Sequence, residues 1–192
     1  MTVVVCVVVM DPNPEVEREV TTNFKSSLKC IAKVVFVKYD RANVSTFSRL
    51  KPKGIILSGS TARILDPNNV ITIDPKVLDM GIPILGICFG YQTMVKLLSG
   101  PQNLRSGTKL ILEPFVTDIT TPFNLPGGVY LLNHYDRVVK APKNWTVAKR
   151  TRSEVIYCHN NITKMMGMIF HPEKHTATGR LFFTEWLKWI SS

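Results

Sequence analysis

No stretch of this 192-residue sequence is apolar over a length that could cross a membrane. A membrane-spanning helix needs roughly 18 or more consecutive apolar residues, and the longest candidate, VVVCVVVM at residues 3–10, is much shorter. No basic segment precedes this run, and Asp11 and Pro12 follow it, so it lacks the form of a signal peptide. We therefore expect a cytoplasmic protein without membrane association, in which residues 3–10 form a buried parallel strand.

The sequence also lacks paired cysteines. None of its four cysteines belongs to a CxxC motif, and none has the spacing of a disulfide framework or a zinc site. Without a secretory signal, reduced thiols are the better interpretation. We expect no metal ion and no cofactor in this chain. The four are Cys6, Cys30, Cys88 and Cys158.

Acidic residues are in short supply. The 24 Lys and Arg against 14 Asp and Glu give a net charge of +10, which favours an anionic partner. The basic residues are spread along the chain, however, and no run is interleaved with aromatics, so direct nucleic-acid binding is not supported beyond the charge itself. A solvated basic surface and a docking face for a partner that handles nucleotides both remain open. The densest cluster is Lys140, Lys143, Lys149, Arg150 and Arg152.

The order of predicted elements indicates the fold class. Strands alternate with helices over the first hundred residues, which is typical of an α/β protein with an open, mostly parallel sheet flanked by helices. The length suits a single domain over residues 1–192. The expected strands are 3–10, 33–39, 52–60 and 82–87, and the expected helices are 15–29, 75–80 and 91–99.

After Gly100 the pattern changes to shorter, often alternating strands separated by Pro and Gly turns. This pattern predicts a small antiparallel addition in the second half of the chain. A further strand is expected over residues 165–170, and an amphipathic helix over residues 179–190. We expect the core contacts of that helix to be Leu181, Trp186, Leu187 and Ile190.

The segment GICFG, residues 86–90, places Cys88 at a sharp bend between a strand and a helix. Two flanking glycines permit the tight turn. Such a bend exposes the side chain at the N-terminus of a helix, where the helix dipole favours a thiolate and free backbone N–H groups can face an oxyanion. The arrangement is the cysteine version of the GxSxG nucleophile elbow. A cysteine that merely fits a tight turn is the structural alternative.

A nucleophilic cysteine needs a base, and the base needs a group that orients it. The segment FHPE, residues 170–173, supplies His171 and Glu173 at the end of a predicted strand. Carboxyl ends of parallel strands meet at one edge of a sheet, so His171 can lie close to Cys88. From the residues alone, the other three histidines suit structural or peripheral roles, with His159 in a turn. They are His134, His159 and His175.

A third strand end carries SGS, residues 58–60. A loop with Gly59 directly after a strand can aim backbone N–H groups at the same oxyanion. An ordinary strand-to-helix turn is the alternative interpretation.

Together, ILGICFGYQ, FHPE and SGS, in their order along the chain, resemble the class I, triad-type glutamine amidotransferase domain over nearly the whole sequence. The resemblance implies that Cys88 attacks the side-chain amide of glutamine, His171 acts as base and acid, and Glu173 orients His171. It also implies a γ-glutamyl thioester, and an oxyanion hole built from the backbone N–H groups of Gly59 and Phe89.

Within that family the sequence looks most like the glutaminase domain of GMP synthetases. Gln92 matches a glutamine that helps to hold the substrate. LLNHYDRVVKAP, residues 131–142, resembles a loop beside the glutamine, which implies that His134, Tyr135 and Asp136 contact the substrate. The sequence departs from the family where Ser60 and Thr61 stand, because a second glycine and a proline are usual there.

The sequence contains no P-loop and no SGGxDS loop. We therefore expect a separate synthetase subunit that accepts the ammonia, most simply for the conversion of XMP to GMP, with ATP and Mg²⁺ bound only by that partner. Two alternatives stay open. One is a free-standing hydrolase of γ-glutamyl amides that uses the same triad, and the other is a non-catalytic regulatory or scaffold homologue.

Overall fold

The computed structural model describes residues 3–119, 122–123 and 125–192. Within that part of the chain, no helix is long and apolar enough to span a bilayer.

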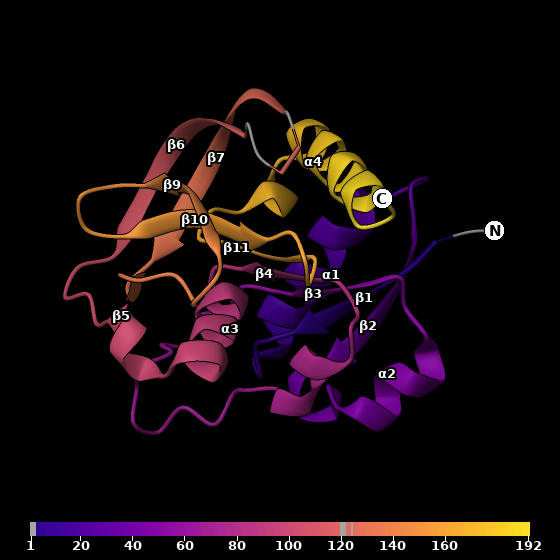
Figure 1. Cartoon of the computed structure of the whole chain (residues 1–192), viewed down its shortest axis with the longest axis horizontal. Coiled ribbons are helices and arrows are strands. Elements are labelled where there is room, and N and C mark those ends of the chain that lie inside the picture. Colours follow the sequence, from indigo (N-terminus) through magenta and orange to yellow (C-terminus); the bar gives the residue numbers. More distant parts are fainter. Residues whose placement is uncertain (1–2, 120–121, 124) are drawn as a thin grey trace.

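A seven-stranded sheet forms the centre of the structure, in the order β2-β1-β3-β4-β11-β10-β9. The strands from β2 to β11 are parallel to one another, and β10 and β9 are antiparallel to their neighbours. The predicted open, mostly parallel α/β sheet with an antiparallel part from the second half of the chain is confirmed (Figure 1). The strands are β1 (Val4–Val9), β2 (Lys33–Lys38), β3 (Gly54–Leu57), β4 (Ile84–Ile87), β9 (Thr146–Arg150), β10 (Val155–Asn160) and β11 (Met165–Met168).

Helices cover both faces of this sheet. Leu57 pairs in register with Gly86, and Gly54 lies an odd number of residues before Leu57, so Gly54 and Gly86 face opposite sides. A side chain at Gly54 would meet Trp186 of α4, and one at Gly86 would meet Met94 of α3. Figure 1 shows α3 and α4 on opposite sides of β3 and β4. The helices are α1 (Pro14–Ser27), α2 (Val44–Leu50), α3 (Phe89–Ser99) and α4 (Thr176–Trp189), with short 3₁₀ turns η1 (Tyr39–Arg41), η2 (Pro75–Asp79), η3 (Pro101–Asn103) and η4 (Pro172–Lys174).

Helices α1 and α4 pack on each other, with the rings of Phe24 and Phe183 5.8 Å apart between centroids. Because helices cover both faces, the central strands carry continuous apolar runs. Residues 5–8 of β1 are fully buried, as the sequence predicts.

Two small antiparallel sheets complete the structure. The long ribbon of β6 (Ile111–Ile119) and β7 (Leu125–His134) extends from the upper left of Figure 1, and β5 (Leu104–Arg105) pairs with β8 (Arg137–Val138). The ribbon is attached to the segment after β11 through a bridge between Leu132 and Phe170 and through the His171 N–H, which donates to the Leu131 carbonyl at 3.1 Å. This attachment brings the end of β7 beside the segment that carries His171.

Several details differ from the sequence-based expectations. Helix α2 and strand β10 were not anticipated, and His159 is a buried residue of β10 and does not lie in a turn. Leu181 is 43% exposed, so its assignment to the core is wrong, whereas Phe182 and Phe183 are fully buried. The helical period of α4 explains this difference. Residues 182 and 183 lie three to four residues before the buried Trp186, and therefore on the same face of the helix.

Candidate active site

Cys88 stands at the bend between β4 and α3, as predicted. It is the residue before the first turn of α3, and its φ of 51° is unusual for a residue other than glycine. The Cys88 N–H donates to the Met168 carbonyl at 2.8 Å, and the Cys88 carbonyl accepts from the Gln92 N–H at 3.0 Å. A side chain at Gly90 would collide with the Leu57 carbonyl. The neighbouring strands thus hold the bend in a conformation that Cys88 would not adopt alone.

His171 and Glu173 form a buried pair at the end of β11. The Nδ1 atom of His171 lies 2.6 Å from Oε1 of Glu173, and each residue is 5% exposed. The Ser27 hydroxyl of α1 donates to the Glu173 carbonyl at 3.2 Å and anchors this turn. The other ring nitrogen, Nε2, is also buried. With Nδ1 bound to Glu173, Nε2 is the atom left for a reacting group.

The surroundings of His171 set its proton affinity. Burial lowers the pKa of the imidazole, but the negative charge of Glu173, the hydrogen bond between Nδ1 and Glu173, and the nearby Cys88 side chain raise it by more, to about 10. At neutral pH the His171 imidazole is therefore protonated, and the Glu173 carboxylate beside it carries the negative charge.

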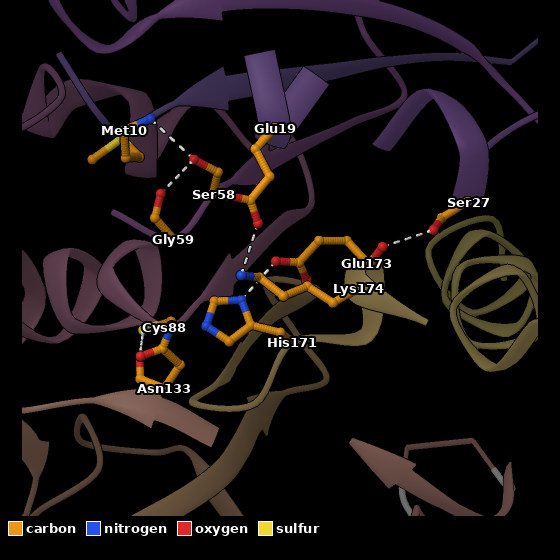
Figure 2. A network of polar contacts seen from close by, with 10 residues as sticks. All are labelled: Met10, Glu19, Ser27, Ser58, Gly59, Cys88, Asn133, His171, Glu173 and Lys174. Atoms are coloured by element: carbon orange, nitrogen blue, oxygen red, sulfur yellow. Dashed lines mark hydrogen bonds and ion pairs between the residues drawn. The ribbon is translucent and has the colours of Figure 1, made fainter. Parts of the chain in front are cut away.

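Gly59 completes the convergence of three strand ends. A Cβ atom added at Gly59 would lie 2.8 Å from Cε1 of His171 and 3.7 Å from Cβ of Cys88. The Cys88 thiol donates to the Asn133 carbonyl at 3.5 Å, so the end of β7 also reaches the site (Figure 2). The segments that follow β3, β4 and β11, together with the end of β7, therefore surround one point.

Backbone N–H groups near this point come from α3 and from the loop after β3. Phe89 is the first residue of α3, and the N–H groups of a first turn have no acceptor within their own helix. The loop is held by Ser58, whose hydroxyl accepts from the Met10 N–H at 3.0 Å and donates to the Gly59 carbonyl at 2.8 Å (Figure 2). The Ser58 carbonyl in turn accepts from the Gly90 N–H at 3.0 Å.

A cavity of about 170 Å³ opens beside Cys88. The predicted substrate residues Gln92, His134, Tyr135 and Asp136 all contribute to its lining. The Gln92 side-chain amide donates to the Asp136 carbonyl at 2.6 Å, so Gln92 fixes the segment after β7 as well as facing the cavity. The remaining lining residues are Ser60, Thr61, Ala62, Arg63, Leu110 and Asn133.

Asp136 carries a carboxylate that is already partnered. Oδ1 lies 2.6 Å from the Arg63 guanidinium, and Oδ2 accepts from the Leu65 N–H at 3.3 Å. The Arg63 side chain is 38% exposed, against 2% for Asp136, and the guanidinium also stacks over the Tyr135 ring at 5.0 Å. The cavity therefore presents one cation and one carboxylate side by side.

The His134 imidazole turns toward β10. Its Nε2 atom lies 2.9 Å from Oε2 of Glu154, and both residues are buried. His134 is thus part of the cavity wall, and the Glu154 pair fixes its ring. Tyr135, by contrast, is 39% exposed.

Comparison with known proteins agrees with this geometry. The sequence profile of the family described as "Glutamine amidotransferase class-I" matches residues 15–189. The chain belongs to this family. As a class I glutamine amidotransferase domain, it contains the cysteine elbow and the HPE segment within the matched range.

Curated relatives of the domain include a protein named GMP synthase [glutamine-hydrolyzing] from Staphylococcus saprophyticus, 34% identical over 143 residues. A protein of the same name from Macrococcus caseolyticus is 30% identical over 142 residues. Each match covers 71% of this chain and 27% of the relative. The chain thus spans only about a quarter of the length of these relatives.

Two solved structures share the fold of this amidotransferase domain. A Thermoplasma acidophilum protein described as a GMP synthase subunit superposes with a TM-score of 0.70 at 18% identity, covering 100% of this chain and 95% of its own. PurLQS from Thermotoga maritima gives a TM-score of 0.69 at 20% identity, covering 100% and 98%. At these identities, the likeness shows the fold alone.

Several residues of the site escaped the sequence analysis. Arg63 belongs to no motif. Ser58 was named only as part of SGS and was given no role of its own, although a serine directly after the fully buried strand β3 is a signal for a buried hydrogen bond. Asp11, which follows β1, was noted only as the end of an apolar run. Among the described residues, no group of three or more His, Cys, Asp and Glu side chains could hold a metal ion.

Proposed function

We propose that this chain hydrolyses the side-chain amide of glutamine, with Cys88 as nucleophile, His171 as acid and base, and Glu173 as the group that orients His171. The observation that carries the proposal is the buried His171–Glu173 pair at 2.6 Å, at the same sheet edge as the Cys88 bend. Membership of the class I glutamine amidotransferase family supports it.

The reaction follows from this arrangement. His171 first takes the proton of the Cys88 thiol and holds it. The Cys88 sulfur then forms a bond to the amide carbon of glutamine as the carbon–oxygen double bond opens, and the carbonyl oxygen takes the negative charge. The N–H groups of Gly59 and Phe89 stabilise that charge. As the carbon–nitrogen bond breaks, His171 gives its proton to the nitrogen and ammonia leaves. Water then attacks the γ-glutamyl thioester, His171 accepts the water proton, and the carbon–sulfur bond breaks to release glutamate.

Glutamine also carries an α-ammonium and an α-carboxylate, and the cavity offers a complement to each. Asp136 is the carboxylate for the ammonium group, and Arg63 is the only Lys or Arg among the described residues that line the cavity. Gln92, His134 and Tyr135 shape the rest of the substrate site. The Arg63–Asp136 pair keeps both charges in place before the substrate arrives.

The ammonia goes to a separate ATP-dependent synthetase subunit in this proposal, most simply one that converts XMP to GMP. The names of the curated relatives and of the Thermoplasma acidophilum structure support this acceptor. ATP and Mg²⁺ belong to the partner. The net charge of +10 suits docking on an acidic surface.

The test is glutamate release from glutamine by the purified chain. We expect turnover and covalent labelling by 6-diazo-5-oxonorleucine, a glutamine-like electrophile, seen as one adduct by intact mass. Cys88→Ala abolishes both, whereas Cys30→Ala, at an exposed cysteine, changes neither. Undiminished turnover by Cys88→Ala would refute the nucleophile. Full activity on larger γ-glutamyl amides without a partner would favour a free-standing hydrolase, and failure of the wild type to react or label would favour a scaffold.

A further inference from the structure

Asp11, the residue that follows β1 and Met10, holds the loop after β3. It is 3% exposed, and its carboxylate accepts four hydrogen bonds. Oδ1 accepts from the Asn13 N–H at 2.9 Å. Oδ2 accepts from the Ser60 hydroxyl at 3.0 Å, the Thr61 N–H at 2.6 Å and the Thr61 hydroxyl at 2.8 Å.

The same loop carries Gly59, whose carbonyl is fixed by Ser58 on its other side. Met10 binds Ser58 and Asp11 binds residues 60 and 61, so two consecutive residues at the end of β1 hold the loop on both sides of Gly59. Figure 2 shows the Met10–Ser58–Gly59 part of this network above His171 and Cys88. The orientation of the Gly59 peptide therefore depends on the end of β1.

We propose that Asp11 is a positioning residue for the oxyanion loop. This inference rests on the proposed glutamine hydrolysis. Asp11 binds the Thr61 N–H and the hydroxyls of Ser60 and Thr61 through one carboxylate oxygen, and so restrains the two residues that follow Gly59.

The effect of losing this restraint falls on catalysis more than on folding. Thr61 is exposed, so its released N–H and hydroxyl can bind water. Ser60 and Thr61 line the cavity at Cys88 and a second cavity of about 110 Å³ at His171. A loop that moves here changes the position of the Gly59 N–H relative to the developing oxyanion.

Asp11→Asn is the sharpest variant because it keeps the shape of the side chain. Each carboxylate oxygen accepts a backbone N–H, one from Asn13 and one from Thr61. An asparagine amide has a single oxygen, so in either orientation its NH₂ group faces one of these donors. We expect kcat for glutamine to fall roughly 10- to 100-fold, at or below the loss typical of one oxyanion donor, with KM little changed.

Two reagents separate positioning from a general loss of structure. Labelling of Cys88 by 6-diazo-5-oxonorleucine, whose carbonyl occupies the oxyanion site, slows in parallel with kcat. Alkylation of Cys88 by iodoacetamide, which needs no such site, keeps its wild-type rate. Asp74→Asn is the matched control, since Asp74 also accepts a backbone N–H, from Lys76 at 3.0 Å, but lines neither cavity.

A double-mutant cycle with Thr61→Val gives an independent test on an exposed residue. Both variants disrupt the same contact, so their effects on kcat are expected to be less than additive. Wild-type kcat in Asp11→Asn, or fully additive losses in the cycle, would overturn the role of Asp11. Should Asp11→Asn fold poorly, Thr61→Val and Ser60→Ala combined must show the same kcat loss. Absence of glutamine turnover in the wild type would instead refute the proposed function.

Discussion

The Arg63 guanidinium lies 2.6 Å from the Asp136 carboxylate, although 73 residues separate them along the chain. The contact joins the loop after β3 to the segment after β7, and both residues line the cavity at Cys88. No motif around Arg63 or around Asp136 predicts this ion pair. In the proposed function, this pair supplies the opposite charges for the zwitterion of glutamine.

Arg63→Gln tests whether the Arg63 guanidinium binds the α-carboxylate of glutamine. The test compares glutamine with a substrate that lacks this group. For glutamine, we expect kcat/KM to fall roughly 10- to 100-fold, in line with one lost hydrogen bond to a charged group. For 4-aminobutanamide, which lacks the α-carboxylate, kcat/KM stays near the wild-type value. Arg105→Gln, at an exposed arginine outside the cavity, is the control. Equal losses on both substrates would mean that Arg63 acts only through the structure of the loop.

Glu173→Gln changes the pKa of His171. The carboxylate is the largest influence that raises this pKa, and burial, which lowers it, is unchanged by the substitution. The imidazole pKa should therefore fall from about 10, and NMR titration of the ring protons measures it. A pKa that stays near 10 in the variant would show that Cys88 alone keeps the ring protonated.

The raised pKa of His171 also makes stability depend on pH. Because it is higher in the folded chain than the ordinary 6.5, the folded state binds more protons between these values. The stabilisation is complete below about pH 6.5 and is lost as pH rises through about 10. Urea unfolding at pH 7 and pH 9.5 should show this loss, and a smaller one in Glu173→Gln. An equal loss of unfolding free energy between pH 7 and pH 9.5 in both proteins would contradict the raised pKa of His171 as its cause.

Gly59→Ala places a methyl group 2.8 Å from the His171 ring. Because His171 is held by Glu173, the ring or the loop must shift, and a small displacement at a reacting centre costs roughly 100-fold in rate. We expect kcat to fall on that scale while the thermal unfolding temperature changes little, because the loop can relax. Wild-type kcat in this variant would show that the loop and the imidazole do not need this close approach.

The Tyr91 hydroxyl and the Cys158 sulfur lie 3.0 Å apart in the core, joining α3 to β10. Tyr91→Phe should lower the free energy of unfolding by about 1 kcal/mol, the net value of one buried hydrogen bond. Urea denaturation measures it. Tyr39→Phe, at a partly exposed tyrosine, is the control. A loss no larger than that of the control would mean that the thiol contributes nothing to holding α3.

Local sequence determined much of this protein. The alternation of apolar strands and helices predicts the parallel sheet, and the glycines around Cys88 predict its bend, because both follow from short-range backbone preferences and burial patterns. His171 and Glu173 are two residues apart, so one strand end orients both. Their position opposite Cys88 follows from the rule that parallel strands end at one edge.

Tertiary structure decided the remainder. Asp11 and Arg63 reach their partners across 50 and 73 residues, and Asn133 reaches Cys88 across 45. Such contacts depend on which strands are neighbours and on how the β6–β7 ribbon docks, and neither is encoded in the periodicity of a segment. Polar residues outside a motif carry no local signal of their partner, since hydrogen bonds form wherever folding leaves donors and acceptors buried together. The sequence therefore predicts the reacting groups, and only the folded chain shows what holds them.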